Sequence, residues 1–133
     1  MIPETERKGQ IAQLQFELAA TKKGFVVSRP TTEVRYDYIL DDFVSLKRVQ
    51  VKYCDAIDPR YKAYIVNVGS GHRQKSYTSE EIDGMVVFFP KEAKVCWFEP
   101  KHFQGKEKMY VRKLIDVKRN KKTTIILENQ HWI

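Results

Sequence analysis

Three polar side chains, Asp37, Gln50 and Lys52, have the types and spacing to hold a metal ion beside a water molecule. In the stretch LKRVQVKYC, a strand would bury Val49 and Val51 and place Gln50 and Lys52 together on its other face. Asp37 can reach the same place from the preceding strand. Carboxylate and amide oxygens suit Mg²⁺, and a lysine beside a metal can orient or help deprotonate a water. An ordinary half-exposed strand with an Asp–Lys ion pair has the same pattern, and VQVK alone favours that interpretation.

The elements that would position these side chains are predicted by the periodicity of the apolar residues. Ile11, Leu14 and Leu18 recur at helical spacing and Gly24 follows, which predicts a helix over about 5–23. An antiparallel meander of three strands is expected next, at 25–28, 36–40 and 46–54. The order of elements indicates an α/β fold without internal repeats.

The second half of the chain has a similar but less regular pattern. Thr78 and Glu81 have the spacing of a capping box, which predicts a short helix starting at Thr78. The stretches KMYVRKL and TTIILEN are compatible with strands or with helix ends. Strands are expected at 63–68, 84–90 and 94–100.

Length and composition predict one globular domain over residues 1–133. The chain is 42% hydrophobic and 12% aromatic, which is enough for one ordinary core. No apolar run reaches the roughly 20 residues that span a bilayer, and the first ten residues are too polar for a secretory signal. Cys54 and Cys96 lie in apolar runs without CxxC spacing. They are expected to be reduced core cysteines of an intracellular protein, in the cytoplasm or nucleoid, and a structural zinc site is not expected.

The positive charge is concentrated at the C-terminal end. Residues 101–133 contain nine basic and three acidic residues, so they carry +6 of the net charge of +7. Such a concentration suits a polyanion, because each neutralised phosphate releases counterions. A solvated basic surface explains the charge equally well.

A Gly-rich basic loop at 69–76 offers a second place where a nucleic acid can bind. Its basic and amide side chains suit phosphates or base edges, although an ordinary surface loop has the same composition. The candidate DNA-binding residues are Arg29, Arg73, Gln74, Lys75, Lys118, Arg119, Lys121 and Lys122.

The chain has an acid on its second strand, a polar-x-Lys sequence on its third strand, and a preceding helix that begins near a glycine. This arrangement resembles the PD-(D/E)XK nuclease superfamily. The resemblance is closest to small endonucleases encoded within group I introns, and it is carried by KGQIAQLQFELAATKKGF, SRP, YDYIL and RVQVK over roughly the first 55 residues. The later YTSEEIDGMVVFF is also similar. The resemblance implies a restriction-endonuclease-like fold, with a mixed β-sheet flanked by α-helices.

The resemblance also implies roles for individual residues. Asp37 would be the motif aspartate, Gln50 would take the usual carboxylate position, and Lys52 would be the motif lysine. Asp37, Gln50 and the carbonyl of Val51 would hold Mg²⁺, with Mn²⁺ as a substitute. The implied activity is a site-specific double-strand cut in duplex DNA for intron homing, which needs a homodimer at least, or a tetramer.

Gln13 departs from the wider pattern, because superfamily members commonly carry a glutamate four residues after the helix glycine. Position 13 would still help to orient the metal or the water, and Glu17, one turn later, either supplies the missing carboxylate or is a solvated helix residue. Gln13 is either natural or a substitution that weakens or inactivates the enzyme. Two alternatives stay open: a structure-specific nuclease that resolves Holliday junctions, and a DNA-binding module on a degenerate nuclease fold.

Overall fold

The structure is a computed structural model that describes residues 1–69, 76–113 and 125–130. Its first element is the helix α1 (Glu4–Lys22), which is followed by Gly24 in the left-handed region with a φ of 79°. This helix confirms the prediction for residues 5–23. Its inner face, however, is not the one marked by the large aliphatic residues. Ala12, Phe16, Ala19 and Ala20 are buried, whereas Ile11, Leu14 and Leu18 face solvent.

The first sheet has five strands in the order β1-β2-β3-β6-β7. The strands β1 (Val26–Ser28), β2 (Tyr38–Asp41) and β3 (Leu46–Tyr53) form the predicted antiparallel meander. β6 (Gly84–Phe89) pairs with β3 in parallel, and β7 (Lys94–Phe98) pairs with β6 in antiparallel orientation. The sheet is therefore mixed, as expected.

The second sheet has the order β4-β5-β8-β9. It contains β4 (Ile57–Asp58), β5 (Ala63–Asn67), β8 (Lys108–Arg112) and β9 (Ile125–Ile126), and only the β8–β9 pair is parallel. The helix α2 (Pro100–Phe103) precedes β8. After β9 the chain forms the 3-10 helix η1 (Leu127–Asn129).

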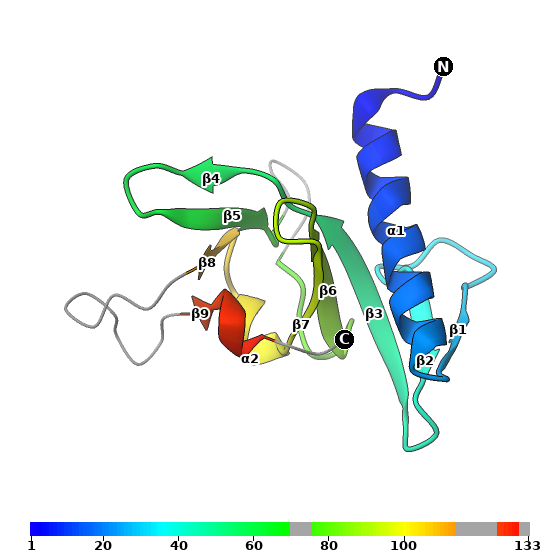
Figure 1. Cartoon of the computed structure of the whole chain (residues 1–133). Helices are drawn as coiled ribbons and strands as arrows, with labels where there is room; N and C mark the ends of the chain where they lie inside the picture. Colours follow the sequence, from blue (N-terminus) through cyan, green and yellow to red (C-terminus); the bar gives the residue numbers. More distant parts are fainter. Residues whose placement is uncertain (70–75, 114–124, 131–133) are drawn as a thin grey trace.

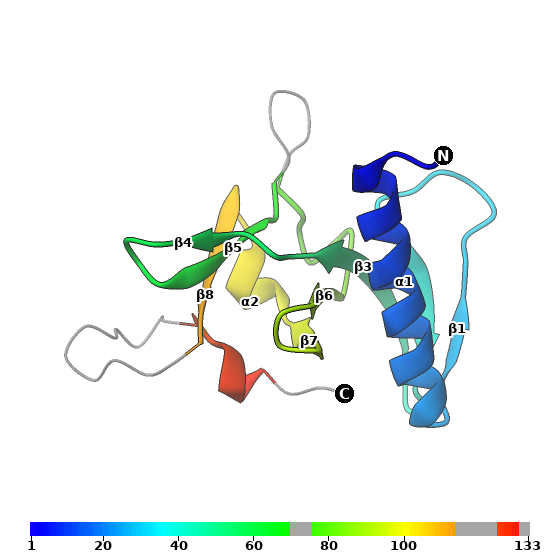
Figure 2. The ribbon, with the colours of Figure 1, turned by 45° about the horizontal axis from the view of Figure 1, so that its top comes forward.

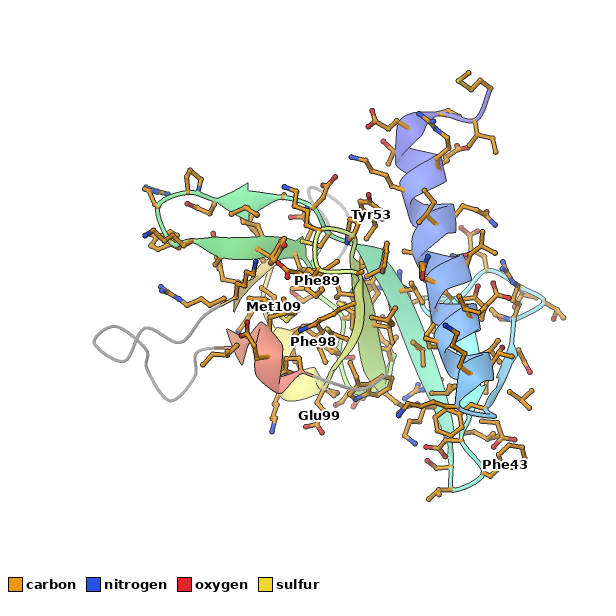
Figure 3. The ribbon with its side chains drawn as sticks, in the orientation of Figure 1. Phe43, Tyr53, Phe89, Phe98, Glu99 and Met109 are labelled. Carbon is orange, nitrogen blue, oxygen red and sulfur yellow. The ribbon has the colours of Figure 1, made fainter. Side chains whose placement is uncertain are left out.

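The molecule has three layers, because α1 and the second sheet lie on opposite sides of the first sheet (Figures 1 and 2). Phe16 of α1 packs in one core with the valines of β3, and a second core lies between the sheets. Figure 3 shows Phe89, Phe98 and Met109 in this second core. All six residues of β6 are buried, because β6 is covered on both faces and is a continuous apolar run rather than an alternating one.

The predicted helix starting at Thr78 is wrong. Residues 79–81 form a single turn, although the Thr78 backbone N–H donates to Oε1 of Glu81 at 3.2 Å, as in a capping box. The Thr78 hydroxyl donates to the same oxygen at 3.2 Å. The chain cannot continue as a helix, because Asp83 N–H donates to the Arg48 carbonyl at 2.9 Å and Gly84 pairs with Val49. Pairing with β3 therefore overrides the local helix pattern.

Cys54 and Cys96 are buried free cysteines, in agreement with their expected core positions. In the parts of the chain that the structure describes, no helix is both long enough and apolar enough to cross a bilayer.

Candidate active site

Asp37 lies one residue before β2 and is anchored to the backbone of β3 at two points. Its N–H donates to the Val49 carbonyl at 2.8 Å, and its carboxylate Oδ2 accepts the Val51 N–H at 2.9 Å. The side chain is half-buried, and burial raises the pKa of Asp37 above its usual range. The hydrogen bond from Val51 and the charges of Lys52 and Arg29 lower the pKa but do not outweigh burial.

Gln50 and Lys52 lie on the face of β3 opposite α1. Val49 and Val51 are buried in the core beneath α1, while Gln50 and Lys52 are half-buried and lie opposite two core residues of β6 on the other face. This alternation confirms that Gln50 and Lys52 share one face of the strand, as the sequence predicts. The two backbone groups that anchor Asp37 belong to the residues on either side of Gln50. None of the salt bridges among the described residues joins Asp37 to Lys52, so the two do not form the cross-strand ion pair of an ordinary strand. The charge of Lys52 nevertheless acts to lower the pKa of Asp37.

Gln13 and Glu17 of α1 both contact Arg29. Arg29 donates through Nη1 to Gln13 Oε1 at 3.5 Å and through Nη2 to Glu17 Oε2 at 3.0 Å. The Tyr38 hydroxyl also donates to Glu17 Oε2, at 2.7 Å. Glu17 is thus a paired residue that fixes α1 to β2, which corrects its interpretation as a merely solvated side chain. Gln13 is linked to the Asp37 carboxylate through the charge of Arg29.

A family model of the PD-(D/E)XK endonucleases matches residues 3–133 of the chain. The chain belongs to the PD-(D/E)XK endonuclease family. The fold is similar to that in "The structure of a bacterial homing endonuclease: I-Ssp6803I", with a TM-score of 0.74, 22% sequence identity, and coverage of 91% of this chain and 86% of that one. No curated protein matches the sequence. The family and the restriction-endonuclease-like fold inferred by resemblance are therefore confirmed.

The donor atoms at this end of β3 fit a hard divalent cation, which PD-(D/E)XK endonucleases typically use. The candidate ligands are the Asp37 carboxylate, the Gln50 side-chain oxygen and the Val51 carbonyl. Because the N–H and C=O of one strand residue point the same way, the Val51 carbonyl faces the side on which its N–H meets Asp37. All these donors are oxygens, as Mg²⁺ and Mn²⁺ prefer.

The candidate metal site has little negative charge of its own. The described residues contain no group of three or more His, Cys, Asp or Glu side chains placed to hold a metal ion. Asp37 is the one carboxylate among the three candidate ligands. Water and the phosphate oxygens of a substrate would have to supply the remaining ligands.

One of the candidate DNA-binding residues, Arg29, lies in the described part of the chain. It is hydrogen-bonded to side chains of α1 and β2, and its own side chain is 55% exposed and therefore accessible to a ligand. The others lie outside the described residues and stay predictions: Arg73, Gln74, Lys75, Lys118, Arg119, Lys121 and Lys122.

Sequence reasoning missed the surroundings of Lys52. Its Nζ lies 5.2 Å from the centroid of the Tyr77 ring, and the Cζ of Arg35 lies 4.0 Å from the same centroid. Arg35 is also paired with Glu81 at 2.9 Å. The one available indication was the Thr78–Glu81 spacing next to Tyr77, which was interpreted as the start of a helix.

Proposed function

We propose that this chain is a metal-dependent endonuclease that cuts both strands of duplex DNA at a specific site. The observation that carries the proposal is the anchoring of Asp37 between the Val49 carbonyl and the Val51 N–H, with Gln50 and Lys52 on the adjoining face of β3. Backbone anchors hold a carboxylate in place without help from flexible side chains, and such preorganisation suits a catalytic metal site.

Hydrolysis of the phosphodiester would combine a metal ion with Lys52. Asp37, Gln50 and the Val51 carbonyl would hold Mg²⁺, or Mn²⁺ in its place, and the bound ion would supply Lewis-acid stabilisation of the phosphoryl charge. Lys52 would orient the attacking water or help to remove its proton, and its ammonium would stabilise negative charge on the phosphate. Gln13 would orient this arrangement through Arg29.

DNA as the substrate is supported by the family and by the distribution of charge. Residues 101–133 carry +6 of the net +7, and neutralising phosphates with such a segment releases counterions. Site-specific cutting for intron homing is supported by the likeness in fold to a homing endonuclease, together with the sequence resemblance to intron-encoded enzymes.

A double-strand cut needs two active sites, and the outer face of α1 suits contact with a second copy of the chain. Ile11, Leu14 and Leu18 form an apolar stripe there, with 43%, 53% and 50% of their surface exposed. In an antiparallel pair of α1 helices centred between residues 14 and 15, Ile11 would lie against Leu18 of the other copy. Such a stripe is self-complementary, as a two-fold interface requires. The assembly would be a dimer or a tetramer.

The absence of a second carboxylate among the candidate ligands favours one alternative, a DNA-binding module that has lost cleavage. Amides at positions 13 and 50 lend oxygen without charge, so they weaken divalent-ion binding. A junction-resolving nuclease is the other alternative, because it would use the same three residues.

Cleavage assays with Mg²⁺ on a random linear duplex library and on four-way junctions separate these functions. The proposal expects a discrete set of linear sequences to be cut on both strands, and no cutting by Asp37→Asn. Preferential cutting of junctions would favour the resolving nuclease. Binding without cutting of any substrate would favour the binding module.

A further inference from the structure

The ammonium of Lys52 rests against an aromatic ring that does not belong to the candidate metal site. Its Nζ lies 5.2 Å from the centroid of Tyr77, within the range of a cation–π contact. Tyr77 is only 5% exposed, and it belongs to the core between the two sheets. The ring is therefore held by packing, whereas Lys52 is half-buried and has four rotatable bonds.

Tyr77 is itself fixed by a second cation. The Cζ of Arg35 lies 4.0 Å from the ring centroid, and Arg35 Nη1 donates to both carboxylate oxygens of Glu81, at 2.9 and 3.0 Å. Oε1 of Glu81 in turn accepts from the amide and the hydroxyl of Thr78 at 3.2 Å each. The capping-box residues thus form the base of a chain of contacts that leads through Arg35 and Tyr77 to Lys52.

We propose that Tyr77 is a positioning residue for Lys52, and that Glu81 and Arg35 fix the ring that does the positioning. The proposal rests on the proposed function of Lys52 in cleavage. A carboxylate partner would neutralise the ammonium and occupy its N–H donors, whereas an aromatic face attracts the charge and leaves the donors to a water or a phosphate. The ring therefore restricts the position of the Lys52 ammonium and leaves its charge and its N–H donors available for the reaction.

Nuclear magnetic resonance of ¹³C-lysine-labelled protein tests the contact without using activity. A lysine over the face of an aromatic ring has upfield-shifted methylene protons, and the signal of Lys52 is assigned by its loss in Lys52→Arg. We expect Tyr77→Leu to abolish the upfield shift and Tyr77→Phe to keep it. Lys8, whose Nζ lies 5.7 Å from the Tyr53 ring, provides an internal control that should not change.

Single-turnover cleavage of a selected duplex then tests the consequence. We expect Tyr77→Leu to slow cleavage about 10-fold to 100-fold, by analogy with the supporting residues of metal sites, while DNA affinity measured with non-cleaving Ca²⁺ stays unchanged. Tyr77→Phe should cleave at nearly the wild-type rate, because it keeps the ring. A slowed Tyr77→Phe, or an unaltered Lys52 signal in Tyr77→Leu, would overturn the proposal.

Glu81→Gln covers the case in which Tyr77→Leu fails to fold. It leaves the core side chains unchanged but weakens the ion pair of Arg35 with residue 81. We therefore expect a smaller upfield shift of the Lys52 signal and slower cleavage. Glu80→Gln is the control, because Glu80 is the exposed neighbouring residue. An unchanged Lys52 signal in Glu81→Gln would contradict the role of Arg35 and Glu81. If the wild-type protein cuts no DNA, the proposed function fails, and the lysine signal still decides whether Tyr77 positions Lys52.

Discussion

The Val51 N–H donates a hydrogen bond to Oδ2 of Asp37 at 2.9 Å, which holds the carboxylate beside β3 at the residue directly before β2 begins. The Asp37 N–H is bound in turn to the Val49 carbonyl at 2.8 Å. Both anchors are backbone groups, so the position of the carboxylate depends on strand pairing rather than on other side chains. The price is a half-buried carboxylate whose pKa is raised by burial.

Asp37→Asn should abolish cleavage and, in the absence of metal, raise the melting temperature at neutral pH. The amide keeps an oxygen for the Val51 N–H but removes the partly buried charge. Because burial raises the pKa of Asp37 in the folded protein, the protonated side chain favours folding. This stabilisation is complete below the unfolded-state pKa near 3.8 and is lost as the pH rises through the folded-state pKa. The variant should therefore lose less stability than the wild type between pH 4 and neutrality. Thermal melts across this range measure both effects.

Glu33→Gln is the control for that experiment, because Glu33 is an exposed carboxylate. Its melting temperature should follow that of the wild type at each pH. A destabilised Asp37→Asn protein at neutral pH would show that the ionised carboxylate stabilises the metal-free fold, contrary to the burial argument.

Gln13→Glu should tighten Mg²⁺ or Mn²⁺ binding and raise the cleavage rate, by about 10-fold to 100-fold if position 13 supports the ion. The change keeps the side-chain shape and adds a negative charge next to Arg29, near Asp37. Titration calorimetry measures the metal affinity. Equal metal affinity and equal cleavage in the variant and the wild type would remove position 13 from the site.

Glu17→Gln is the comparison variant for that experiment, and it should affect the stability of the fold rather than the metal affinity. Glu17 accepts hydrogen bonds from Arg29 and Tyr38. Hydrogen bonds to a charged group stabilise a fold more than neutral ones, but exposure of the Arg29–Glu17 pair to solvent reduces their contribution. The replacement should therefore lower the free energy of unfolding by about 1 kcal/mol. Metal affinity should change little. Loss of metal binding in Glu17→Gln, without an effect of Gln13→Glu, would transfer the carboxylate role to Glu17.

Neutralising Lys118, Arg119, Lys121 and Lys122 together should lower the affinity for any duplex. The slope of log affinity against log salt should flatten by about one unit for each phosphate contact removed. Neutralising Lys22 and Lys23 at the end of α1 provides the control, with no expected change in slope. An unchanged slope in the fourfold variant would exclude this segment as a phosphate-binding surface.

Leu14→Glu should convert the oligomer to monomers, because it places a charge at the centre of the apolar stripe on α1. Analytical ultracentrifugation measures the state of assembly. Val44→Glu is the matched control, since Val44 is 90% exposed but lies on the turn between β2 and β3. An unchanged oligomer in Leu14→Glu would place the interface elsewhere.

The shared face of Gln50 and Lys52 was predictable, because the pattern that determines it lies within one strand. The alternation in VQVK fixes which face Gln50 and Lys52 share, and the burial of Val49 and Val51 in the structure agrees with it. The anchoring of Asp37 was not predictable, because β2 begins at Tyr38, two residues after the expected start of the strand, and leaves Asp37 outside it. Tyr77 approaches Lys52 only through the pairing of distant segments.

The buried face of α1 did not follow from the sequence, for a packing reason. Periodicity marks Ile11, Leu14 and Leu18 as one apolar stripe, but the helix presents Phe16 and three alanines to the sheet. Small residues allow the helix backbone to approach the valines of β3 closely, which the larger aliphatic residues would prevent. A helix with two apolar stripes does not reveal from sequence which one is buried. The very short strands β4 and β9 were missed or left undecided, because two residues show no periodicity.

Single-turnover cleavage by Lys52→Ala, with Mg²⁺ and a duplex selected by the wild-type protein, tests the central claim most directly. Folding is monitored by melting temperature and DNA affinity by binding in Ca²⁺, and Lys23→Ala serves as the surface control. We expect cleavage to fall about 100-fold or more while folding and affinity stay at wild-type values, because Lys52 acts on the water and the phosphate rather than on the fold. Cleavage by Lys52→Ala at the wild-type rate, or a loss of cleavage that is fully explained by unfolding, would contradict the account.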